Sequence, residues 1–547
     1  MSENRRIARA AGLVGVLTFL SRIAGLARDV VVGYYFGAGA ASDAFFVAFR
    51  APNLLRRFVA EGAMSVALIP VFTDYLTKRP REKADEAISA VATMMTVIVA
   101  LLTLAGVASA WWLTRLFAPG FTDDPAKFEL TVTLTRIVFP YIFLVGMVAL
   151  AGGILNSVRH FAAPATSPVL LNLAMIAAAV FLSPYFAEPI VGQAYGVLIG
   201  GVLQLLLQIP PIMRHGFRLR PLWAPGHDAV QRSLRLMAPM IFGAAVYQIN
   251  VVIGTIFASM LPGGSVSYLW YSGRVFEFPL GIFSVALGTA ALPSFSSQVS
   301  RKAFDEMAHS MSFSIRLTNL ISVPATIGIA VLALPITSVL FFRGAYSFED
   351  CSQTAAALAA YAVGLWSVSM VRLFAPAFYA LGDTQMPVKA AAIAFVANLI
   401  VSLALMGPVD SGASAVGQLI AWTTAATAIA DLRHVGLALA TSVAATTNLL
   451  FLVLWLRGRL PQLRLAPLMP SFLRSSVASL AMIPPLLFIQ SSVNWETAPL
   501  SLRAMALSTA VAVGMGTFAA VALLLGGEEV AAMRRILTER LARMRSR

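Results

Sequence analysis

The sequence is short of charged residues and has almost no cysteine. Only 12% of its 547 residues are Asp, Glu, Lys or Arg, whereas 59% are hydrophobic and the mean hydropathy is +0.80. This composition excludes an ordinary soluble globular protein. The single cysteine, Cys351, excludes an intrachain disulfide and the cysteine-based metal patterns. The five histidines lie in or near predicted loops without a metal-ligand pair, so we expect no metal site.

Clusters of carboxylates or histidines near the predicted loops are also missing. A membrane glycosyltransferase would need such a cluster for metal or base chemistry, so we expect no enzymatic activity. The net charge of +15 does not indicate a nucleic-acid partner, because most Lys and Arg lie in short connections between apolar runs. Basic residues in such connections set the topology of a membrane protein.

Apolar windows between polar breaks predict an all-α polytopic membrane protein with about fourteen transmembrane helices. The windows lie near residues 12–36, 43–76, 86–116, 130–156, 163–183, 189–212, 232–261, 267–297, 309–341, 354–381, 387–407, 435–456, 472–491 and 501–525. The first window could imitate a signal peptide. Arg22 and Arg28 interrupt it and no small-residue cleavage site follows, so we expect a retained first span.

Basic residues concentrate in alternate connections and in the tail from Arg534 to Arg547. By the positive-inside rule, both termini are expected to be cytoplasmic. The apolar segment 413–430 is nearly long enough to form another span. A crossing there would turn the basic 457–464 loop and the tail outward, so the charge rule favours an interfacial or re-entrant helix on the outer side.

The chain also repeats itself at an offset of 223 or 224 residues. The matching landmarks are Pro70 and Pro293, Pro164 and Pro387, Gly120 and Gly344, and Arg50 and Arg274. Six spans fit within one offset, and an even number gives both halves the same orientation, so we expect a parallel repeat. This predicts an N-lobe (1–225, helices 1–6), a C-lobe (226–460, helices 7–12), and two extra helices with a basic cytoplasmic tail (461–547).

Charged side chains lie inside several apolar stretches, where each costs ~2.5–3.5 kcal/mol on insertion scales. They are Arg22, Arg28, Asp29, Arg50, Arg56, Arg57, Glu61, Arg274 and Glu277. Such charges are tolerated when they face a bundle interior or a water-filled cavity. The acidic residues available are too few to pair every arginine, so an anionic cargo is favoured. Guanidinium groups bind phosphate oxygens bidentately and stay charged when partly desolvated.

A purely structural reading of these charges remains open. Arg57 and Glu61 are spaced i,i+4, and Arg274 and Glu277 are spaced i,i+3, so each pair could form a salt bridge that fixes a bend near Pro52 or Pro279. Arg28 and Asp29 are adjacent in the sequence and should point in different directions. We therefore do not expect them to neutralise each other.

Four stretches resemble one known family. "SRIAGLARD", "ASDAFFVAFRAPNLLRRFVAEGA", "RVFEFPLGIFSVALGT" and "FYALGDTQMPVK" are similar to the MurJ (MviN) lipid II flippases of the multidrug/oligosaccharidyl-lipid/polysaccharide exporter superfamily. The resemblance implies fourteen helices in the bacterial inner membrane, two of them bordering a lipid groove. It also implies transport of undecaprenyl-diphosphate-linked peptidoglycan precursor from the inner to the outer leaflet by alternating access.

The resemblance also implies which residues form the binding site. It implies that the arginines hold the diphosphate headgroup and that Asp43 gates or positions it. The implied cargo-binding residues are Arg22, Arg28, Asp43, Arg56 and Arg274, with Asp29, Asn53, Arg57, Glu61 and Glu277 as secondary candidates. This chain departs from the family pattern at Gly273, where an acidic residue is expected, and in its longer 409–434 connection.

The resemblance also sets expectations about partners and energy. The partners would be lipid II, membrane lipids and the cell-wall synthesis machinery, and transport would need no cofactor but a membrane potential or an ion gradient. Some relatives bind sodium in the second lobe. The side-chain oxygens that could bind sodium here belong to Asn250, Asn398, Ser402 and Asn448. None of these is a carboxylate, so we assign no sodium site. The alternative is an exporter of another polyprenyl-diphosphate oligosaccharide or of an anionic small molecule. A cation exporter would need an acidic cavity.

Overall fold

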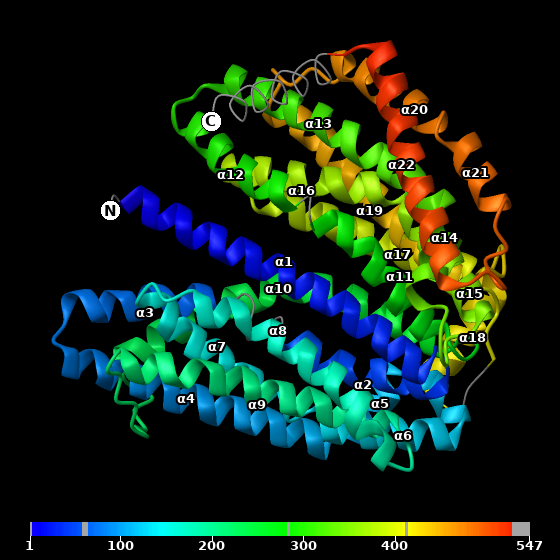
Figure 1. Cartoon of the computed structure of the whole chain (residues 1–547). Helices are drawn as coiled ribbons and strands as arrows, with labels where there is room; N and C mark the ends of the chain where they lie inside the picture. Colours follow the sequence, from blue (N-terminus) through cyan, green and yellow to red (C-terminus); the bar gives the residue numbers. More distant parts are fainter. Residues whose placement is uncertain (1–2, 57–63, 282–284, 411–413, 528–547) are drawn as a thin grey trace. The chain divides into compact units, whose positions relative to one another are not determined.

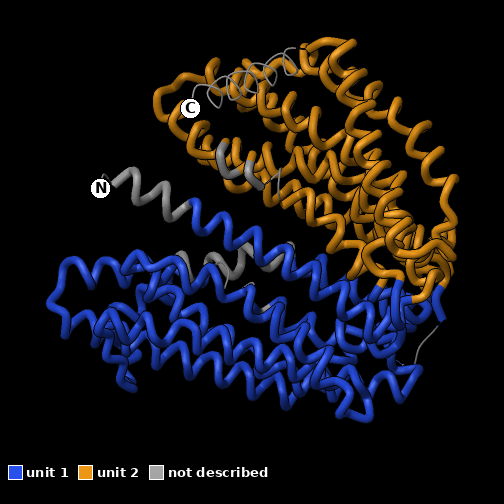
Figure 2. The backbone as a smooth tube through the Cα atoms, viewed as in Figure 1, with its two compact units in different colours: residues 1–267, 343–346, 409–421 blue, residues 268–342, 347–408, 422–547 orange. Residues whose placement is uncertain are grey.

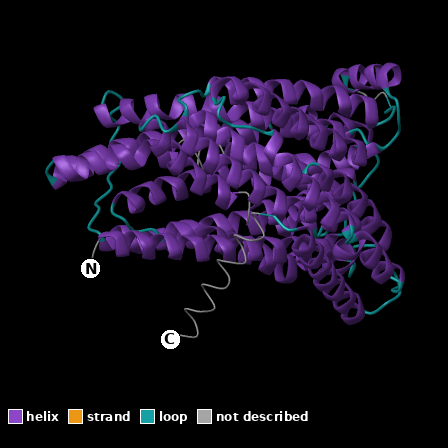
Figure 3. Ribbon diagram, turned by 90° about the horizontal axis from the view of Figure 1, so that it is seen from above, coloured by secondary structure: helices purple, strands orange, loops and turns teal. Residues whose placement is uncertain are grey.

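The chain is helical almost throughout. The computed structural model describes residues 3–56, 64–281, 285–410 and 414–527. In this part of the chain the sole β element is an isolated bridge between Met406 and Asp431, and the ribbon is otherwise helix and loop (Figure 3). The predicted all-α fold class is therefore confirmed.

The first half of the chain contributes ten α-helices (Figure 1). Their bounds are α1 Glu3–Phe36, α2 Ala40–Arg56, α3 Met64–Lys78, α4 Arg81–Ala108, α5 Ala110–Phe117, α6 Pro125–Val138, α7 Tyr141–Ser157, α8 Ala162–Ala177, α9 Ile190–Arg214 and α10 Asp228–Ser259.

The second half continues in the same manner. Its bounds are α11 Ser265–Pro279, α12 Val285–Ser300, α13 Phe304–Val331, α14 Ala333–Phe341, α15 Phe348–Val363, α16 Leu365–Ala380, α17 Gln385–Leu405, α18 Ala415–Thr427, α19 Arg433–Arg459, α20 Met469–Leu480, α21 Ile483–Ser491 and α22 Leu500–Leu525.

Each expected span coincides with one helix or with two consecutive helices. Several spans are broken, for example at Ser109 between α4 and α5 and at Gly364 between α15 and α16. Within the described residues, nine segments are long and apolar enough to cross a membrane, and ten if the bent α15–α16 pair counts as one. The protein is thus a multi-pass membrane protein, and the count of fourteen spans stays a prediction.

Contacts between helices divide the chain into two compact units (Figure 2). Unit 1 comprises residues 1–267, 343–346 and 409–421, and unit 2 comprises residues 268–342, 347–408 and 422–547. The division into units reflects which helices pack together, and its boundaries differ from those of the sequence repeat. The lobe boundaries predicted from the repeat therefore stay a prediction.

Each unit has a core built from equivalent helices of the repeat. In unit 1, Phe72 of α3, Ile88 of α4 and Leu155 of α7 are fully buried together. The residues 223 positions later, on α12, α13 and α16, form the corresponding core of unit 2; they are Phe295, Met311 and Phe378. Equivalent buried residues on equivalent helices confirm the pseudo-symmetric repeat.

Two glycines singled out by the repeat make equivalent contacts, both inside unit 1. Gly120 lies against the carbonyl oxygen of Ser259 at the end of α10, so closely that a Cβ on Gly120 would collide with it. Gly344, with φ +62°, lies equally close to the carbonyl oxygen of Tyr34 near the end of α1. The backbone N–H of Ala345 donates to that same oxygen at 2.8 Å. Each of these two connections thus contacts the end of the helix that opens the other repeat.

The segment that contains α18 leaves α17 and returns to the same end of that helix. After the connection, the backbone N–H of Ile429 donates to the carbonyl of Ala404 at 2.8 Å, and that of Leu432 donates to Leu405 at 2.9 Å. The chain therefore returns to the end of α17 from which it left, and a single helix of 13 residues is too short to cross a bilayer. Residues 414–430 therefore do not form an extra span, as the charge rule favoured, and the position of this helix on the outer side stays a prediction.

Candidate functional site

Helix α1 carries a buried ion pair between adjacent residues. Arg28 and Asp29 are 7% and 2% exposed. The guanidinium of Arg28 folds back so that Nη2 and Nε donate to Oδ1 of Asp29 at 2.7 and 3.1 Å. The expectation that adjacency would keep these charges apart was wrong, because the long arginine side chain can reverse its direction.

Asn172 of α8 completes this group and was missed from the sequence. Its Oδ1 accepts a hydrogen bond from Nη1 of Arg28 at 3.1 Å. Its Nδ2 donates to the carbonyl of Ser21 on α1 at 3.3 Å, so the amide joins the two helices. The signal available in the sequence was a single amide within an apolar span.

Arg22 lies on the same helix, half-buried, six residues before Arg28. In the described part of the chain, Arg22 forms no hydrogen bond or ion pair, whereas Arg28 shares its charge with Asp29. Among the described side chains, Arg22 is therefore a cation of α1 that no protein group neutralises. A cation of this kind at membrane depth indicates a bound anion or water.

Asp43 is 1% exposed in the first turn of α2 and is saturated with hydrogen bonds. Its Oδ2 accepts from Nζ of Lys127 at 2.9 Å and from the backbone N–H of Gly264 at 2.8 Å. Its Oδ1 accepts from the backbone N–H and the hydroxyl of Ser267 at 3.0 and 2.7 Å. Four donors leave little capacity for cargo, so the geometry favours positioning over direct binding.

Lys127 is a second residue that the sequence analysis did not single out, since it lies between the expected spans 86–116 and 130–156. Its Nζ lies 4.0 Å from the ring centroid of Phe121 as well as 2.9 Å from Asp43. A cation–π contact and a charge-assisted hydrogen bond together hold the ammonium in place.

Arg274 on α11 has a looser environment. Its Nη1 approaches Oε2 of Glu277 at 3.4 Å, and its Cζ lies 4.8 Å from the ring centroid of Trp270. Glu277 is about half exposed, so this ion pair holds Arg274 only weakly. The i,i+3 salt bridge considered in the sequence analysis is therefore present.

The remaining candidates lie at the end of α2. Nε of Arg56 donates to Oδ1 of Asn53 at 3.0 Å. Arg57 and Glu61 lie outside the described residues. Two further half-buried arginines interrupt apolar helices and were passed over in the sequence: Arg316 on α13 and Arg372 on α16. The rule that selected Arg22 could have found both.

The structure therefore brings the predicted residues together in part. Arg28, Asp29 and Asn172 form one group, and Asp43 forms another with Lys127 and Ser267. Within the described residues, no hydrogen bond joins Asp43 to an arginine of α1. The assignment of these residues to cargo binding stays a prediction.

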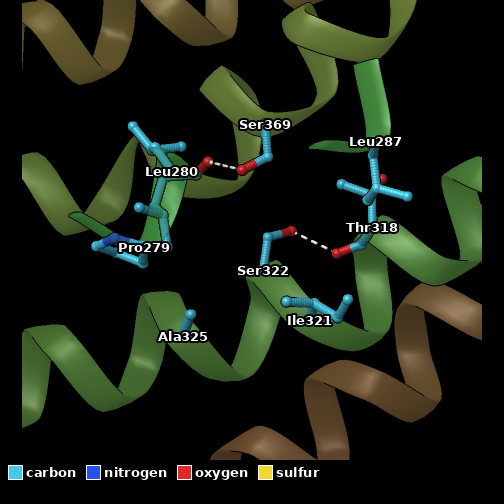
Figure 4. A pocket seen from close by; sticks show the side chains of 9 residues that line it. Pro279, Leu280, Leu287, Thr318, Ile321, Ser322, Ala325 and Ser369 are labelled. Carbon is cyan, nitrogen blue, oxygen red and sulfur yellow. Dashed lines mark hydrogen bonds between the residues drawn. The ribbon is translucent and has the colours of Figure 1, made fainter. Parts of the chain in front are cut away.

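A small cavity inside unit 2 is too small to hold cargo. It measures about 20 Å³ and is bordered by Pro279 of α11, α13 and α16 (Figure 4). The hydroxyls of Ser322 and Ser369 donate to carbonyl oxygens of their own helices, at 2.6 and 2.9 Å. The space corresponds to about one water molecule. Groups of three or more metal-ligating side chains are absent from the described residues.

The fold and the buried charges define a class, a multi-pass helical membrane transporter built from two repeats. Residues 32–506 match the family described as lipid II flippase MurJ. The chain is 37% identical to the probable lipid II flippase MurJ of Vibrio cholerae, over 96% of this chain and 97% of that protein. It therefore belongs to the lipid II flippase MurJ family, a family of transporters, and the expectation that it is not an enzyme is confirmed.

Solved structures agree with this assignment. A lipid II flippase MurJ in an inward closed conformation matches with a TM-score of 0.74 and 25% identity, over 94% of this chain and 98% of that one. An inward-facing multidrug resistance MATE transporter of the MOP superfamily shares the fold, with a TM-score of 0.63 and 15% identity over 83% of this chain and 98% of that one.

Proposed function

We propose that this chain is a lipid II flippase. It moves the undecaprenyl-diphosphate-linked peptidoglycan precursor from the inner to the outer leaflet of the cytoplasmic membrane by alternating access. The observation that carries the proposal is the match to the family along nearly the whole chain.

The chemistry of the candidate site supports an anionic headgroup. Arg22 is an arginine at membrane depth that forms no ion pair within the described residues, and Arg274 contacts Glu277 at 3.4 Å and the ring of Trp270 at 4.8 Å. Guanidinium groups suit diphosphate oxygens because they bind them bidentately and stay charged when partly desolvated. The oxygens of Asp43 are already occupied by Lys127 and by the start of α11, so this carboxylate positions neighbouring elements and does not bind the headgroup directly.

The orientation and the energy source complete the proposal. Both termini are cytoplasmic, and the membrane is the bacterial inner membrane. The cycle draws on the membrane potential or on an ion gradient, since one charge moved through 100 mV supplies about 2.3 kcal/mol. The cell-wall synthesis machinery receives the flipped precursor.

The function is tested by depleting the protein in its own cell and measuring which leaflet holds lipid II. Accumulation in the inner leaflet, reversed by the wild-type chain, is the expected result. A normal leaflet distribution after depletion would exclude lipid II as the cargo and direct the search to other polyprenyl-diphosphate oligosaccharides.

The site is tested separately by substitution in the same assay. Arg22→Ala should abolish rescue at normal membrane levels, and Arg22→Lys should rescue only in part because an ammonium cannot bind bidentately. Arg218→Ala, which removes an exposed loop arginine, is the matched control and should rescue fully. Full rescue by Arg22→Ala would remove Arg22 from the site without affecting the flippase assignment.

A further inference from the structure

Two buried glutamines of α9 differ in their hydrogen bonding. Gln204 and Gln208 lie one turn apart and are 4% and 0% exposed. An amide side chain has N–H donors and an oxygen acceptor, and burying them is costly unless they are hydrogen-bonded. Gln204 meets this condition, because its Nε2 donates to the carbonyl of Ser167 at 3.1 Å and its Oε1 accepts from the hydroxyl of Tyr141 at 3.4 Å. Gln208 does not: among the described residues, neither its Nε2 nor its Oε1 has a hydrogen-bond partner.

The packing of α8 against α9 determines which groups surround Gln208 (Figure 1). Leu171 of α8 packs against Gly200 of α9, where an added Cβ would lie 2.7 Å from Cδ1 of the leucine. Ser167, one turn earlier on α8, accepts a hydrogen bond from Gln204, one turn later on α9. The two helices therefore run antiparallel, and one further turn places Gln208 beside the beginning of α8.

A small space beside Gln208 borders three helices. A Cβ added to Gly152 of α7 would lie 3.6 Å from Oε1 of Gln208 and 3.7 Å from Cβ of Pro164 on α8. Apart from its neighbours on α7, these are its closest contacts in the described part of the chain, so a methyl group would meet no collision there. Gly152 thus leaves room for a group of about that size between α7, α8 and α9, and the amide oxygen of Gln208 borders this room.

The same turn of α8 supplies two further polar groups. The hydroxyl of Ser167, which is 2% exposed, has no hydrogen-bond partner among the described residues. Pro168 has no N–H, so the carbonyl of Pro164 lacks its usual helical donor. Together with Gln208 these groups offer both donors and acceptors, and none of them is charged. A cation would repel the amide N–H groups and an anion would repel the carbonyl oxygens, whereas a small neutral molecule that both donates and accepts suits all of them.

We infer that unit 1 binds ordered water between α7, α8 and α9, with the amide of Gln208, the hydroxyl of Ser167 and the carbonyl of Pro164 as its partners. A buried water molecule typically makes about three hydrogen bonds to polar groups that otherwise have none, and this site supplies that number. Water is also about as large as the methyl-sized space beside Gly152. The assignment involves none of the charged candidates and does not depend on the proposed function.

Filling the space with a methyl group tests the inference. Alanine is a better helix former than glycine, so Gly152→Ala should raise the unfolding temperature if no water binds there. Displacing a bound water instead leaves the amide of Gln208 buried without a partner, so we expect a lower unfolding temperature. Gly328→Ala on α13 is the matched control, because a Cβ there would lie 3.8 Å from the apolar Cε of Met482, and it should keep or raise the unfolding temperature. A rise for Gly152→Ala equal to that of the control would overturn the inference.

The same change in a Gln208→Leu background separates the loss of water from steric strain. Leucine needs no hydrogen bond, so Gly152→Ala should no longer lower the unfolding temperature there, and an equal loss in both backgrounds would count against bound water. The direct test is a density map of the full-length protein in lipid nanodiscs, at a resolution that shows ordered water. We expect a peak within hydrogen-bond distance of the Gln208 amide and the Ser167 hydroxyl, absent from Gly152→Ala. A wild-type map without this peak would overturn the inference, whether or not the variants fold.

Discussion

Ser267 donates two hydrogen bonds to one oxygen of Asp43, from its backbone N–H at 3.0 Å and from its hydroxyl at 2.7 Å. The backbone N–H of Gly264 donates to the other oxygen at 2.8 Å. A carboxylate of α2 thus caps the first turn of α11, where unpaired N–H groups favour negative charge. Arg274 lies about two turns further along α11.

Removing the Asp43 carboxylate should destabilise the protein strongly. Asp43→Ala leaves the ammonium of Lys127 buried without its ion-pair partner, and such a loss costs about 3–5 kcal/mol. Adding Lys127→Met should recover part of this loss, because the unpaired charge is then removed as well. Thermal unfolding of the purified protein measures both effects. Equal unfolding temperatures for wild type and Asp43→Ala would contradict the capping role.

Single and double variants of the Arg28–Asp29 pair can show whether these residues serve stability, transport or both. Arg28→Ala should lower the unfolding temperature because Asp29, 2% exposed, keeps a buried charge. The double variant Arg28→Ala, Asp29→Ala removes both charges and should recover most of the stability. If Arg28 also binds cargo, the double variant will remain inactive in the leaflet assay. Activity restored together with stability would show that the pair is purely structural.

Much of the fold could be predicted because hydrophobic patterns and repeat offsets can be read directly from the order of the residues. The 223-residue offset found between prolines also relates the buried Phe72 and Phe295, so the repeat was real at the level of packing. The number of spans could not be checked by length alone, because breaks such as Gly364 divide a span into helices that are individually too short.

The partners of the charged residues could not be predicted in the same way. Arg28 was expected to stay apart from Asp29, but side-chain conformation decides whether adjacent charges meet, and sequence spacing does not encode it. Lys127 lies 84 residues from Asp43, and only the packing of α6 against α2 brings them together. Contacts over such distances depend on the tertiary structure.

The free energy of unfolding should fall in mildly acidic solution because of His160, a histidine outside the membrane-spanning segments. His160 follows α7, and burial lowers its pKa below the ordinary value of 6.5, with a further contribution from His215, whose ring centroid is 5.6 Å away. Because the folded state disfavours the proton, this contribution is complete above pH 6.5 and is lost as the pH falls through the lower folded pKa. Unfolding temperatures of wild type and His160→Gln, compared between pH 7.5 and pH 5.5, test this. The wild type should lose more stability than the variant; an equal loss would exclude His160.

The contact between Gly344 and Tyr34 should tolerate no side chain, and three glycines allow its causes to be separated. Gly382 has φ +76° with open space around it, so Gly382→Ala measures the cost of the left-handed backbone alone, about 1–2 kcal/mol. Gly120→Ala measures the collision with Ser259 without that backbone conformation. Gly344→Ala combines both effects and should give the lowest unfolding temperature of the three. If Gly344→Ala were no worse than Gly382→Ala, the approach of α1 to this connection would be loose, and the equivalence of the two glycine contacts would fail.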